Sequence, residues 1–222
     1  MNIAILGNGR MGKLISKLAV EKGHRIVSTS SSNNPAKGLD LITADVAIDF
    51  STPTTAFQNI SHALNNGIPV ISGTTGWLNK LNEIKKICKK NNGAFLYSSN
   101  FSLGMNLFFK LNKQFSELMK NQQYNGKIHE IHHSEKLDKP SGTAKKLAND
   151  SDSILKDKLQ ITSDRTKDIS GIHSVKFTSN EDEIEIKHTA SNRNGFAIGA
   201  IRAAEWIKDK KGVFTLDDIQ IK

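Results

Sequence analysis

A glycine-rich turn near the amino end of the chain limits the possible folds more than any other feature of the sequence. The apolar run Asn2–Leu6 leads directly into Gly7-Asn8-Gly9-Arg10-Met11-Gly12, and a helical pattern then continues to Lys22. A G-x-G-x-x-G string in this strand–turn–helix setting is typical of a site that binds the pyrophosphate of a dinucleotide. The alternative is a glycine-rich turn that binds no ligand.

Each glycine of the turn has its own physical reason to be there. Gly7 permits the tight turn, Gly9 lets a pyrophosphate approach the backbone, and Gly12 lets the helix pack closely on the strand. The start of the helix adds unpaired N–H groups and the positive end of the helix dipole. We therefore expect residues 7–12 to bind NADH or NADPH.

The position that usually distinguishes these two cofactors lacks an acid. In dinucleotide-binding folds, an Asp or Glu about 20 residues after the turn binds the free ribose 2′-hydroxyl of NAD. Here that position falls within Ser28-Thr29-Ser30-Ser31-Ser32, and the next acid is Asp40. Hydroxyl groups, with Lys37 close by in the sequence, tolerate a 2′-phosphate. NADPH is therefore allowed, and NADH is not excluded.

Short apolar runs and helical patterns alternate through the first half of the chain. This alternation predicts a parallel sheet with helices on both faces. The expected strands are 2–6, 25–29, 45–50, 68–72 and 94–97, and the expected helices are 10–22, 53–66 (opened by Pro53) and 77–91.

Two of these strands end in polar loops. Ser72-Gly73-Thr74-Thr75-Gly76 follows one strand, and Ser98-Ser99-Asn100-Phe101 follows the next. Ligands of open α/β sheets bind at the carboxyl ends of strands, so both loops are expected to line the cofactor site. The alternative for the first loop is a polar turn that caps the following helix.

The pattern changes after residue 101. The sequence predicts a long amphipathic helix over 103–120, with apolar residues at Leu107, Leu111, Phe115, Leu118 and Met119. Strands are expected over 127–133, 172–177 and 183–189, helices over 141–156 and 196–208, and an extended tail over 212–221. The final helix should return to the first sheet. The prediction is an α/β protein with a Rossmann-type, parallel-sheet dinucleotide-binding domain (residues 1–101 plus 194–222) and an inserted α+β substrate-binding and oligomerisation domain (residues 102–193).

The stretch Glu130–Ala144 carries most of the reactive groups. His132 and Lys136 lie on either side of the expected end of a strand, so their side chains can converge on one pocket. An imidazole beside a cation suits proton donation to a carbanion that develops after hydride attack. Ser141-Gly142-Thr143 then opens a helix, and its N–H groups and hydroxyls can bind a carboxylate.

The same stretch argues against a metal site. His132 and His133 are adjacent on a strand and so point to opposite faces, and no Cys or third His lies at ligand spacing. The alternative for the whole stretch is a surface strand, a loop and a helix cap without a chemical role.

These residues resemble a known family. Glu130–Ala144 matches the E-x-H-H-x-x-K-x-D-x-P-S-G-T-A signature of the 4-hydroxy-tetrahydrodipicolinate (dihydrodipicolinate) reductase family. Supporting matches are spread over nearly the whole chain: Asp49-Phe50-Ser51 with Pro53, Gly73–Gly76, Asn100-Phe101-Ser102 with Gly104 and Asn106, Gly171–Val175, and Glu183–Ala190 with Arg193 and Phe196–Ala200.

The resemblance implies an enzyme that uses NADPH or NADH to reduce 4-hydroxy-tetrahydrodipicolinate to tetrahydrodipicolinate, in the diaminopimelate route to lysine. It implies that His132 is the acid/base group and Lys136 the proton donor. The implied substrate-binding residues are His133, Ser141, Gly142, Thr143 and Arg193. The cofactor would lie on Gly7, Asn8, Gly9, Arg10, Met11, Gly12, Gly73, Thr74, Thr75, Ser98, Ser99, Asn100 and Phe101.

The resemblance also implies a homo-oligomer, because the family builds a tetramer from the sheets of its substrate domain. The segment after Val175 departs from the family pattern. Lys176-Phe177-Thr178-Ser179-Asn180 passes almost directly to Glu181–Ile186, without the family's longer insertion. The shortening removes no signature residue but puts the tetramer in question for this chain.

The composition restricts the classes of binding partner that are expected. The chain has 31 Lys and Arg against 22 Asp and Glu, a net charge of +9, yet five of the basic residues are Arg and the lysines are scattered. We expect anionic small molecules as partners rather than nucleic acid. No apolar run approaches the roughly 20 residues of a membrane span. The single cysteine, Cys88, favours a reducing cytoplasmic location.

Two rival functions remain at this point. One is another Rossmann dehydrogenase of the aspartate-semialdehyde or aspartate type, which would lack the Pro140–Thr143 carboxylate site beside the histidine pair. The other is an NAD(P)H-sensing protein that binds nucleic acid through its lysines. It would need a basic recognition helix or a winged element, and the sequence contains neither.

Overall fold

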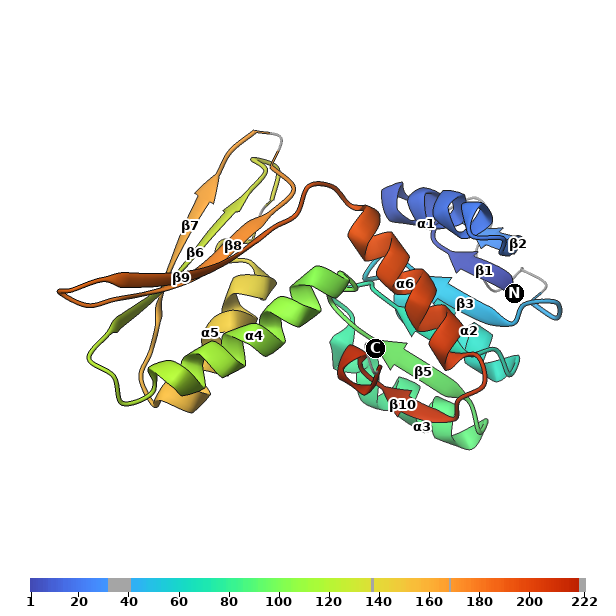
Figure 1. Ribbon diagram of the computed structural model, residues 1–222. Coiled ribbons are helices and arrows are strands. Elements are labelled where there is room, and N and C mark those ends of the chain that lie inside the picture. Colours follow the sequence, from blue (N-terminus) through green and yellow to red (C-terminus); the bar gives the residue numbers. More distant parts are fainter. Residues whose placement is uncertain (32–40, 137, 168, 220–222) are drawn as a thin grey trace. The chain divides into compact units, whose positions relative to one another are not determined.

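The computed structural model describes residues 1–31, 41–136, 138–167 and 169–219. It divides into two compact units (Figure 1). Unit 1 contains Met1–Ser102 and Phe196–Lys222, and unit 2 contains Leu103–Gly195.

Unit 1 is built on a parallel sheet of six strands. They lie in the order β10-β5-β4-β3-β1-β2, and every adjacent pair is parallel. The strands are β1 (Asn2–Leu6), β2 (Arg25–Ser30), β3 (Val46–Asp49), β4 (Val70–Ser72), β5 (Ala94–Tyr97) and β10 (Gly212–Phe214). The strand order reverses beside β1, which has β2 on one side and β3 on the other. In open α/β sheets, that reversal creates the crevice in which ligands bind.

Helices cover both faces of this sheet. α1 (Arg10–Glu21) and α6 (Asn194–Ile207) pack on one face, in a core that includes Ile3 and Ile5. α2 (Ala56–Asn65) and α3 (Leu81–Lys90) pack on the other, against Ala4 and Leu6. Because alternate residues of β1 are buried on opposite faces, the run Ile3–Leu6 had to be apolar throughout. The predicted doubly covered parallel sheet is confirmed.

Unit 2 is a four-stranded mixed sheet with two helices. The strands are β6 (Asn125–His132), β7 (Gln160–Arg165), β8 (Ile172–Thr178) and β9 (Glu183–Thr189), in the order β7-β6-β8-β9. β6 pairs in parallel with β7 and antiparallel with β8. α4 (Leu103–Met119) and α5 (Gly142–Leu155) close one core with the sheet, in which Ile128, Val175 and Phe177 are buried.

Two elements differ from the sequence-based expectation. β7 was not predicted, because its sequence QITSDR has one aliphatic residue, Ile161, among polar ones. The expected extended tail instead supplies β10, which pairs with β5 at the edge of the parallel sheet.

The start of α2 also differs from the expected start at Pro53. A turn precedes the helix, in which the Ala56 N–H donates to the Thr52 carbonyl (2.9 Å), and α2 begins at Ala56.

The buried face of α4 differs from the predicted apolar stripe. Leu107, Leu111 and Leu118 are exposed. Asn112 and Ser116 are buried instead, because they bond to the backbone of Leu147 (3.1 Å) and the hydroxyl of Ser151 (2.9 Å) on α5. Hydrogen bonding allows polar side chains to occupy this helix–helix contact.

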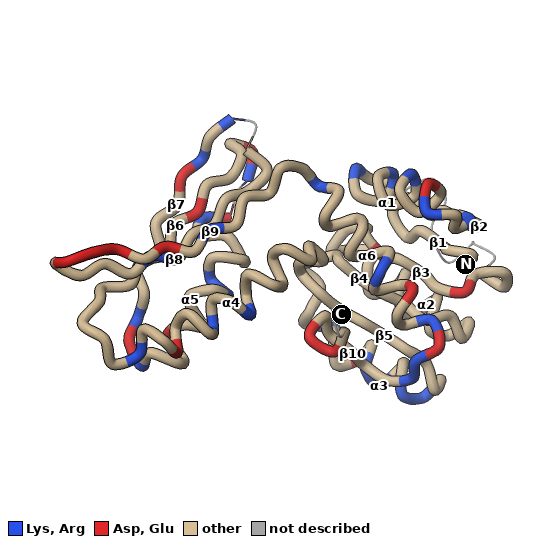
Figure 2. The backbone as a smooth tube through the Cα atoms, in the orientation of Figure 1, with Lys and Arg blue, Asp and Glu red and all other residues tan. Residues whose placement is uncertain are grey.

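The charged residues are dispersed over both units (Figure 2). Lys and Arg recur along α1 and α3, whereas the end of the β8–β9 hairpin is acidic. Of the helices described here, none has both the length and the apolar character needed to cross a membrane.

Candidate functional site

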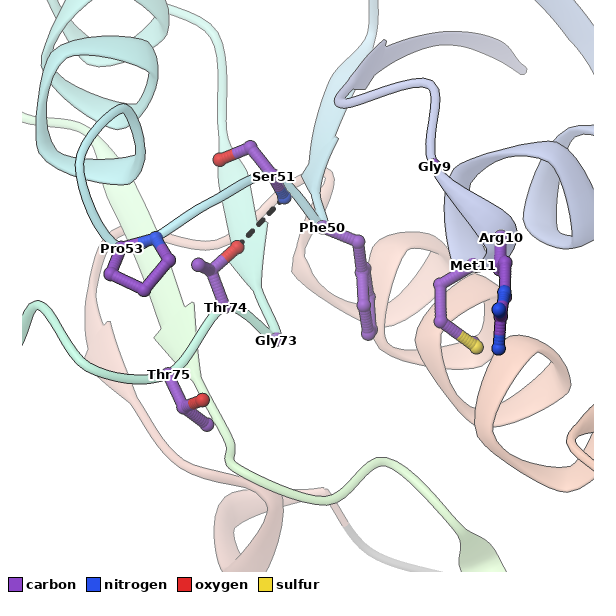
Figure 3. Close-up of a pocket in the computed structure, with 9 residues that line it drawn as sticks. All are labelled: Gly9, Arg10, Met11, Phe50, Ser51, Pro53, Gly73, Thr74 and Thr75. Atoms are coloured by element: carbon purple, nitrogen blue, oxygen red, sulfur yellow. Dashed lines mark hydrogen bonds between the residues drawn. The ribbon is translucent and has the colours of Figure 1, made fainter. Parts of the chain in front are cut away.

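In unit 1, a cavity lies at the carboxyl ends of the parallel strands (Figure 3). Its volume is about 320 Å³, and it is lined by Gly9, Arg10, Met11, Phe50, Ser51, Pro53, Gly73, Thr74 and Thr75. The strand register explains why these loops meet. Leu6 pairs with Asp49, and Asp49 pairs with Ser72, so β1, β3 and β4 end side by side.

The three glycines of the first turn occupy different environments. A Cβ on Gly7 would lie 2.3 Å from the Phe50 carbonyl oxygen, and one on Gly12 would lie 1.9 Å from the Gly7 carbonyl oxygen. Gly7 also has φ +112°, which disfavours any side chain. Gly9, in contrast, has open space where its Cβ would be. Gly7 and Gly12 therefore build the turn, and Gly9 leaves room for a ligand.

The buried carboxylate of Asp49 joins two of the loops that line the cavity. Its Oδ2 accepts hydrogen bonds from the hydroxyls of Ser72 (2.8 Å) and Thr74 (2.7 Å), and its Oδ1 accepts one from Ser51 (2.6 Å). The Thr74 hydroxyl in turn accepts the Ser51 N–H (2.9 Å; Figure 3). Burial raises the pKa of Asp49, and the hydroxyl donors oppose that rise.

The predicted cofactor residues are only partly brought together. Gly9, Arg10, Met11, Gly73, Thr74 and Thr75 line the cavity. Ser98 and Asn100 bond within their own loop, and Phe101 is buried in the core with its ring 5.7 Å from that of Phe50. Phe50, Ser51 and Pro53 were not predicted as site residues. Their place directly after a buried strand that neighbours the glycine turn is the signal that could have identified them.

At the end of β2, serines stand where the acid usually lies: Ser30 is the last residue of the strand and Ser31 follows it. The Gly7 N–H donates to the Ser30 hydroxyl (3.0 Å), so Ser30 holds the glycine turn. Lys37 and Asp40 lie outside the described residues.

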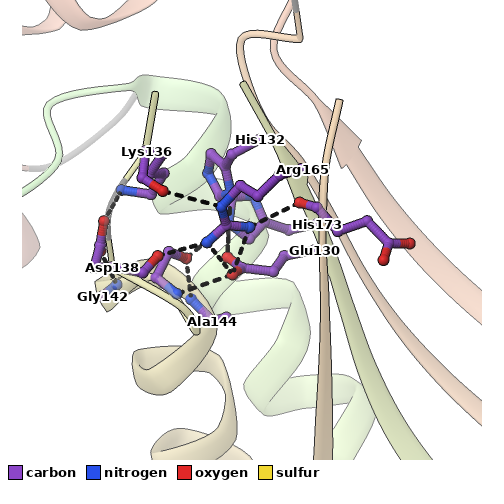
Figure 4. Close-up of polar contacts among 10 residues, drawn as sticks. Glu130, His132, Lys136, Asp138, Gly142, Ala144, Arg165 and His173 are labelled. Atoms are coloured by element: carbon purple, nitrogen blue, oxygen red, sulfur yellow. Dashed lines mark hydrogen bonds and ion pairs between the residues drawn. The ribbon is translucent and has the colours of Figure 1, made fainter. Parts of the chain in front are cut away.

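In unit 2, the signature residues form a polar cluster around Glu130 (Figure 4). Glu130 and His132 share the inner face of β6 because they are two residues apart. The register then adds one residue from each neighbouring strand: His173 of β8 pairs with Glu130, and Arg165 of β7 pairs with His132. Neither His173 nor Arg165 was predicted as a site residue, because each comes from a strand distant in sequence.

Glu130 contacts His132, His173, Ser141 and Arg165. Its side chain is fully buried, with Oε2 3.2 Å from His132 Nδ1 and 3.7 Å from His173 Nε2. Oε1 accepts the Ser141 N–H (2.9 Å) and lies 3.3 Å from Arg165 Nη2. Burial opposes ionisation of this carboxyl, but the hydrogen bonds from Ser141 and Ser163 and the neighbouring His132 together outweigh that effect and lower its pKa.

The two histidines of the cluster are held neutral. Burial lowers the pKa of His132, and Lys136 and Arg165 lower it further, against the opposing effect of Glu130. Burial and the neighbouring His132 lower the pKa of His173 to about 3. Because Nδ1 of His132 faces Glu130, its other edge, Cδ2 and Nε2, faces Gly171.

Lys136 lies in the segment that follows β6. Its ammonium group is 2.7 Å from Asp138 Oδ1, and Asp138 Oδ2 accepts the Gly142 N–H at 3.3 Å. Burial opposes ionisation of Asp138, but Lys136 and the Gly142 N–H together with the backbone outweigh it and lower the pKa of this carboxyl. One carboxylate thus connects the lysine to the first residue of α5.

The start of α5 is largely used within the protein. The Ser141 hydroxyl accepts the Ala144 N–H (3.1 Å) and caps the helix, and the Ser141 N–H is taken by Glu130. Gly142 is exposed and Thr143 half-buried. Ser141 therefore supports the site, whereas Gly142 and Thr143 are open to a ligand. His133 is half-buried just beyond β6, and Arg193 is exposed before α6.

Glu130, His132 and His173 also form the kind of group that can hold a metal ion, with donor atoms within 4.8 Å of one another. The third histidine escaped the sequence analysis because cross-strand register, not sequence spacing, brings it in. Arg165 already places a positive charge on Glu130, so a divalent cation there would be opposed by the guanidinium and by Lys136. The absence of a metal site stays a prediction.

Comparison with known proteins gives a consistent result. The family model for the N-terminus of dihydrodipicolinate reductase matches residues 1–101, and the model for its C-terminus matches residues 104–219. The 4-hydroxy-tetrahydrodipicolinate reductase of Christiangramia forsetii is 45% identical over 99% of this chain and 97% of that protein. The enzyme of the same name from Archaeoglobus fulgidus is 32% identical over 98% of this chain and 99% of that protein.

The fold agrees with that of a solved structure. A dipicolinate-bound dihydrodipicolinate reductase from Paenisporosarcina sp. TG-14 superposes with a TM-score of 0.77, covering 99% of both chains at 21% sequence identity.

Proposed function

Because the chain belongs to the dihydrodipicolinate reductase family, we propose that it acts as a 4-hydroxy-tetrahydrodipicolinate reductase and that the residues around Glu130 perform the proton chemistry. The enzyme is an NAD(P)H-dependent oxidoreductase that forms tetrahydrodipicolinate in the diaminopimelate route to lysine. The residue assignment is supported by the place of Lys136 just beyond the end of β6, the strand that ends at His132, and by Asp138, which links the lysine to the start of α5.

The residues of unit 1 suit a nicotinamide dinucleotide. Gly9 has open space beside it, and the N-terminus of α1 has no side-chain cap, so its N–H groups are available to a pyrophosphate. Gly73, Thr74 and Thr75 supply a polar wall to the same cavity. When bound, the cofactor supplies the hydride. Both NADPH and NADH are proposed as donors, because the end of β2 has hydroxyls in place of an acid.

Lys136 is proposed as the proton donor. Its ammonium group is paired with Asp138, which orients the group without removing its charge. His132 is neutral at pH 7, because its pKa is lowered, so we assign it an orienting and acid/base role rather than that of a fixed cation. The substrate carbanion is thus protonated from Lys136, beside an imidazole of defined orientation.

The substrate is a dicarboxylate, and exposed or half-buried polar residues of unit 2 are available to bind it. Gly142 leaves open space and Thr143 offers a hydroxyl at the start of α5, where the helix dipole favours an anion. His133 and Arg193 are proposed as further carboxylate contacts. Dipicolinate, the ligand of the Paenisporosarcina enzyme, is a flat dicarboxylate and is therefore a suitable probe of this site.

We further propose a cytoplasmic homo-oligomer. The exposed leucines 107, 111 and 118 of α4 support self-association, because apolar side chains repeated along one helix are costly to leave in water. Light scattering should give a mass above the 24.5 kDa of one chain. A monomer at micromolar concentration would contradict this part of the proposal.

A coupled assay tests the activity. The substrate is made in place by a synthase that condenses pyruvate with aspartate semialdehyde, and consumption of NADPH or NADH is followed by absorbance. We expect consumption that requires the synthase and both of its substrates. Reduction of NADP⁺ by aspartate semialdehyde in the presence of phosphate, or oxidation of NADH with oxaloacetate and ammonia, without turnover of the synthase product, would favour an aspartate-semialdehyde or aspartate dehydrogenase instead.

A further inference from the structure

The guanidinium group of Arg165 is hydrogen-bonded to several residues of the polar cluster in unit 2. Arg165 is the last residue of β7, and its side chain is 14% exposed. A guanidinium group has five N–H donors in a fixed plane. All five have acceptors here: Nε donates to the Lys136 carbonyl (3.2 Å), Nη1 to Glu130 Oε1 (3.4 Å) and the Asp164 carbonyl (2.7 Å), and Nη2 to Glu130 Oε1 (3.3 Å) and the Asp138 carbonyl.

Apart from the Asp164 carbonyl on β7 itself, the acceptors lie on two different parts of the chain. Glu130 belongs to the rigid centre of the sheet, since β6 is paired on both sides. The carbonyls of Lys136 and Asp138 belong to the segment between β6 and α5, whose described residues, 133–136 and 138–141, lie in no strand. Arg165 therefore fastens the backbone of the Lys136 segment to the sheet.

Glu130 extends this connection to the other reactive groups. The oxygen that binds Arg165 also accepts the Ser141 N–H at the start of α5, and the second oxygen faces Nδ1 of His132. Lys136, His132 and the start of α5 are thus positioned through one buried ion pair. Such a pair is costly to bury and is weak support for stability, which favours a role in positioning.

We propose that Arg165 is a positioning residue that holds the Lys136 segment in its reactive conformation through Glu130. This inference rests on the proposed function, because Lys136 is the proton donor in that reaction. Arg165 need not touch substrate or cofactor. Replacing Arg165 should release the backbone of Lys136 from the sheet, although the Lys136 ammonium group and Asp138 are both still present.

The first experiment compares Arg165→Ala and Arg165→Lys with the unaltered protein in steady-state kinetics. A misplacement of about 1 Å at a reacting group can cost roughly 100-fold in rate, so kcat of Arg165→Ala should fall by about that factor. The dissociation constant of NADPH should stay within about twofold, because the cofactor residues belong to unit 1. Arg165→Lys should recover little activity, since an ammonium cannot match the planar set of acceptors.

Added guanidinium distinguishes a positioning role of Arg165 from a role in folding. Millimolar guanidinium chloride should raise kcat of Arg165→Ala at least several-fold, because the free cation can occupy the vacated site, and it should not raise kcat of Arg165→Lys. The matched control is Asp164→Asn, which changes the neighbouring β7 residue and its exposed contact with His129. It should keep kcat near that of the unaltered protein.

Hydrogen exchange gives a readout that does not need activity. In Arg165→Ala, the amides of Ser134–Lys136 and those of Asp138, Lys139, Ser141 and Gly142 should exchange faster, while those of β8 and β9 should not change. If the unaltered protein does not turn over the synthase product, the proposed function fails, and exchange still tests the positioning role. The proposal is overturned if Arg165→Ala keeps kcat within twofold, if its exchange is unchanged, or if it only loses thermal stability without a fall in kcat.

Discussion

At the scale of single residues, the buried carboxylates of Asp49 and Glu130 fasten loop residues to the ends of strands. Asp49 binds three hydroxyl groups at the carboxyl ends of β3 and β4. Glu130 binds Ser141 and Arg165 and faces two histidines. Neither side chain is exposed, so each organises neighbouring groups that are themselves within reach of a ligand.

Lys136 carries the clearest prediction about the chemistry. Lys136→Met keeps most of the side-chain length but removes the proton and the charge, so kcat should fall about 100-fold or more. The dissociation constant of NADPH should be unchanged, because the glycine turn lies in the other unit. Lys145→Met, an exposed lysine on α5, is the matched control and should keep full activity. Near-normal turnover of Lys136→Met would refute the assigned role.

Ser31 tests the basis of cofactor choice. It follows the last residue of β2, where an acid would bind the ribose 2′-hydroxyl of NADH and repel the 2′-phosphate of NADPH. Ser31→Glu should shift the ratio of kcat/KM values toward NADH by about tenfold, the size of one charged hydrogen bond. Ser31→Gln, of equal size but neutral, should shift it much less. Equal shifts in both variants would contradict the electrostatic explanation.

At the scale of elements, the sequence predicted the parallel sheet, its helices and the glycine turn well, because each depends on local pattern. It missed β7, since alternating polar residues with one Ile give too weak a signal. It also misassigned the buried face of α4, where Asn112 and Ser116 are buried by bonding to α5. Arg165 and His173 reach the candidate site through strand register, which no single segment encodes.

Asp49 tests whether the ends of β3 and β4 are held together for the cofactor. Asp49→Asn replaces one acceptor oxygen by a donor, so at least one hydroxyl of Ser51, Ser72 or Thr74 loses its partner. We expect a loss of about 1–3 kcal/mol in the free energy of unfolding and a weaker affinity for NADPH.

Asp45→Asn is the control for this prediction, because Asp45 precedes β3 at its opposite end and accepts the Asn2 N–H (2.7 Å). It should lower stability without changing cofactor affinity. Urea unfolding and NADPH titration check both variants. Unchanged cofactor affinity in Asp49→Asn would show that the network serves the fold and not the site.

At the scale of the whole molecule, acid should destabilise the protein through the histidines of unit 2. A histidine whose pKa is lowered by folding binds its proton more readily in the unfolded chain. His173, with a pKa of about 3 beside His132, Glu130, His188 and Lys136, therefore costs stability as the pH falls below the ordinary value of 6.5. The slope is about 1.4 kcal/mol per pH unit for each such proton.

Urea unfolding at pH 7 and pH 5 checks this prediction. The free energy of unfolding should be lower at pH 5, and the difference should be smaller in His173→Gln. Ser174→Ala, a change at the next residue of β8 that removes no titratable group, should keep the full difference. An equal pH dependence in His173→Gln would contradict the assignment to His173.

The proposed reaction depends on one event, the transfer of hydride from a nicotinamide cofactor to the substrate ring. The most direct measurement uses NADPH carrying deuterium at both C4 positions, with the synthase product as substrate, and mass spectrometry of the tetrahydrodipicolinate formed. The product should gain one deuterium per molecule in the unaltered protein. A product without deuterium, formed while the cofactor is oxidised, would contradict hydride transfer from the nicotinamide to the substrate.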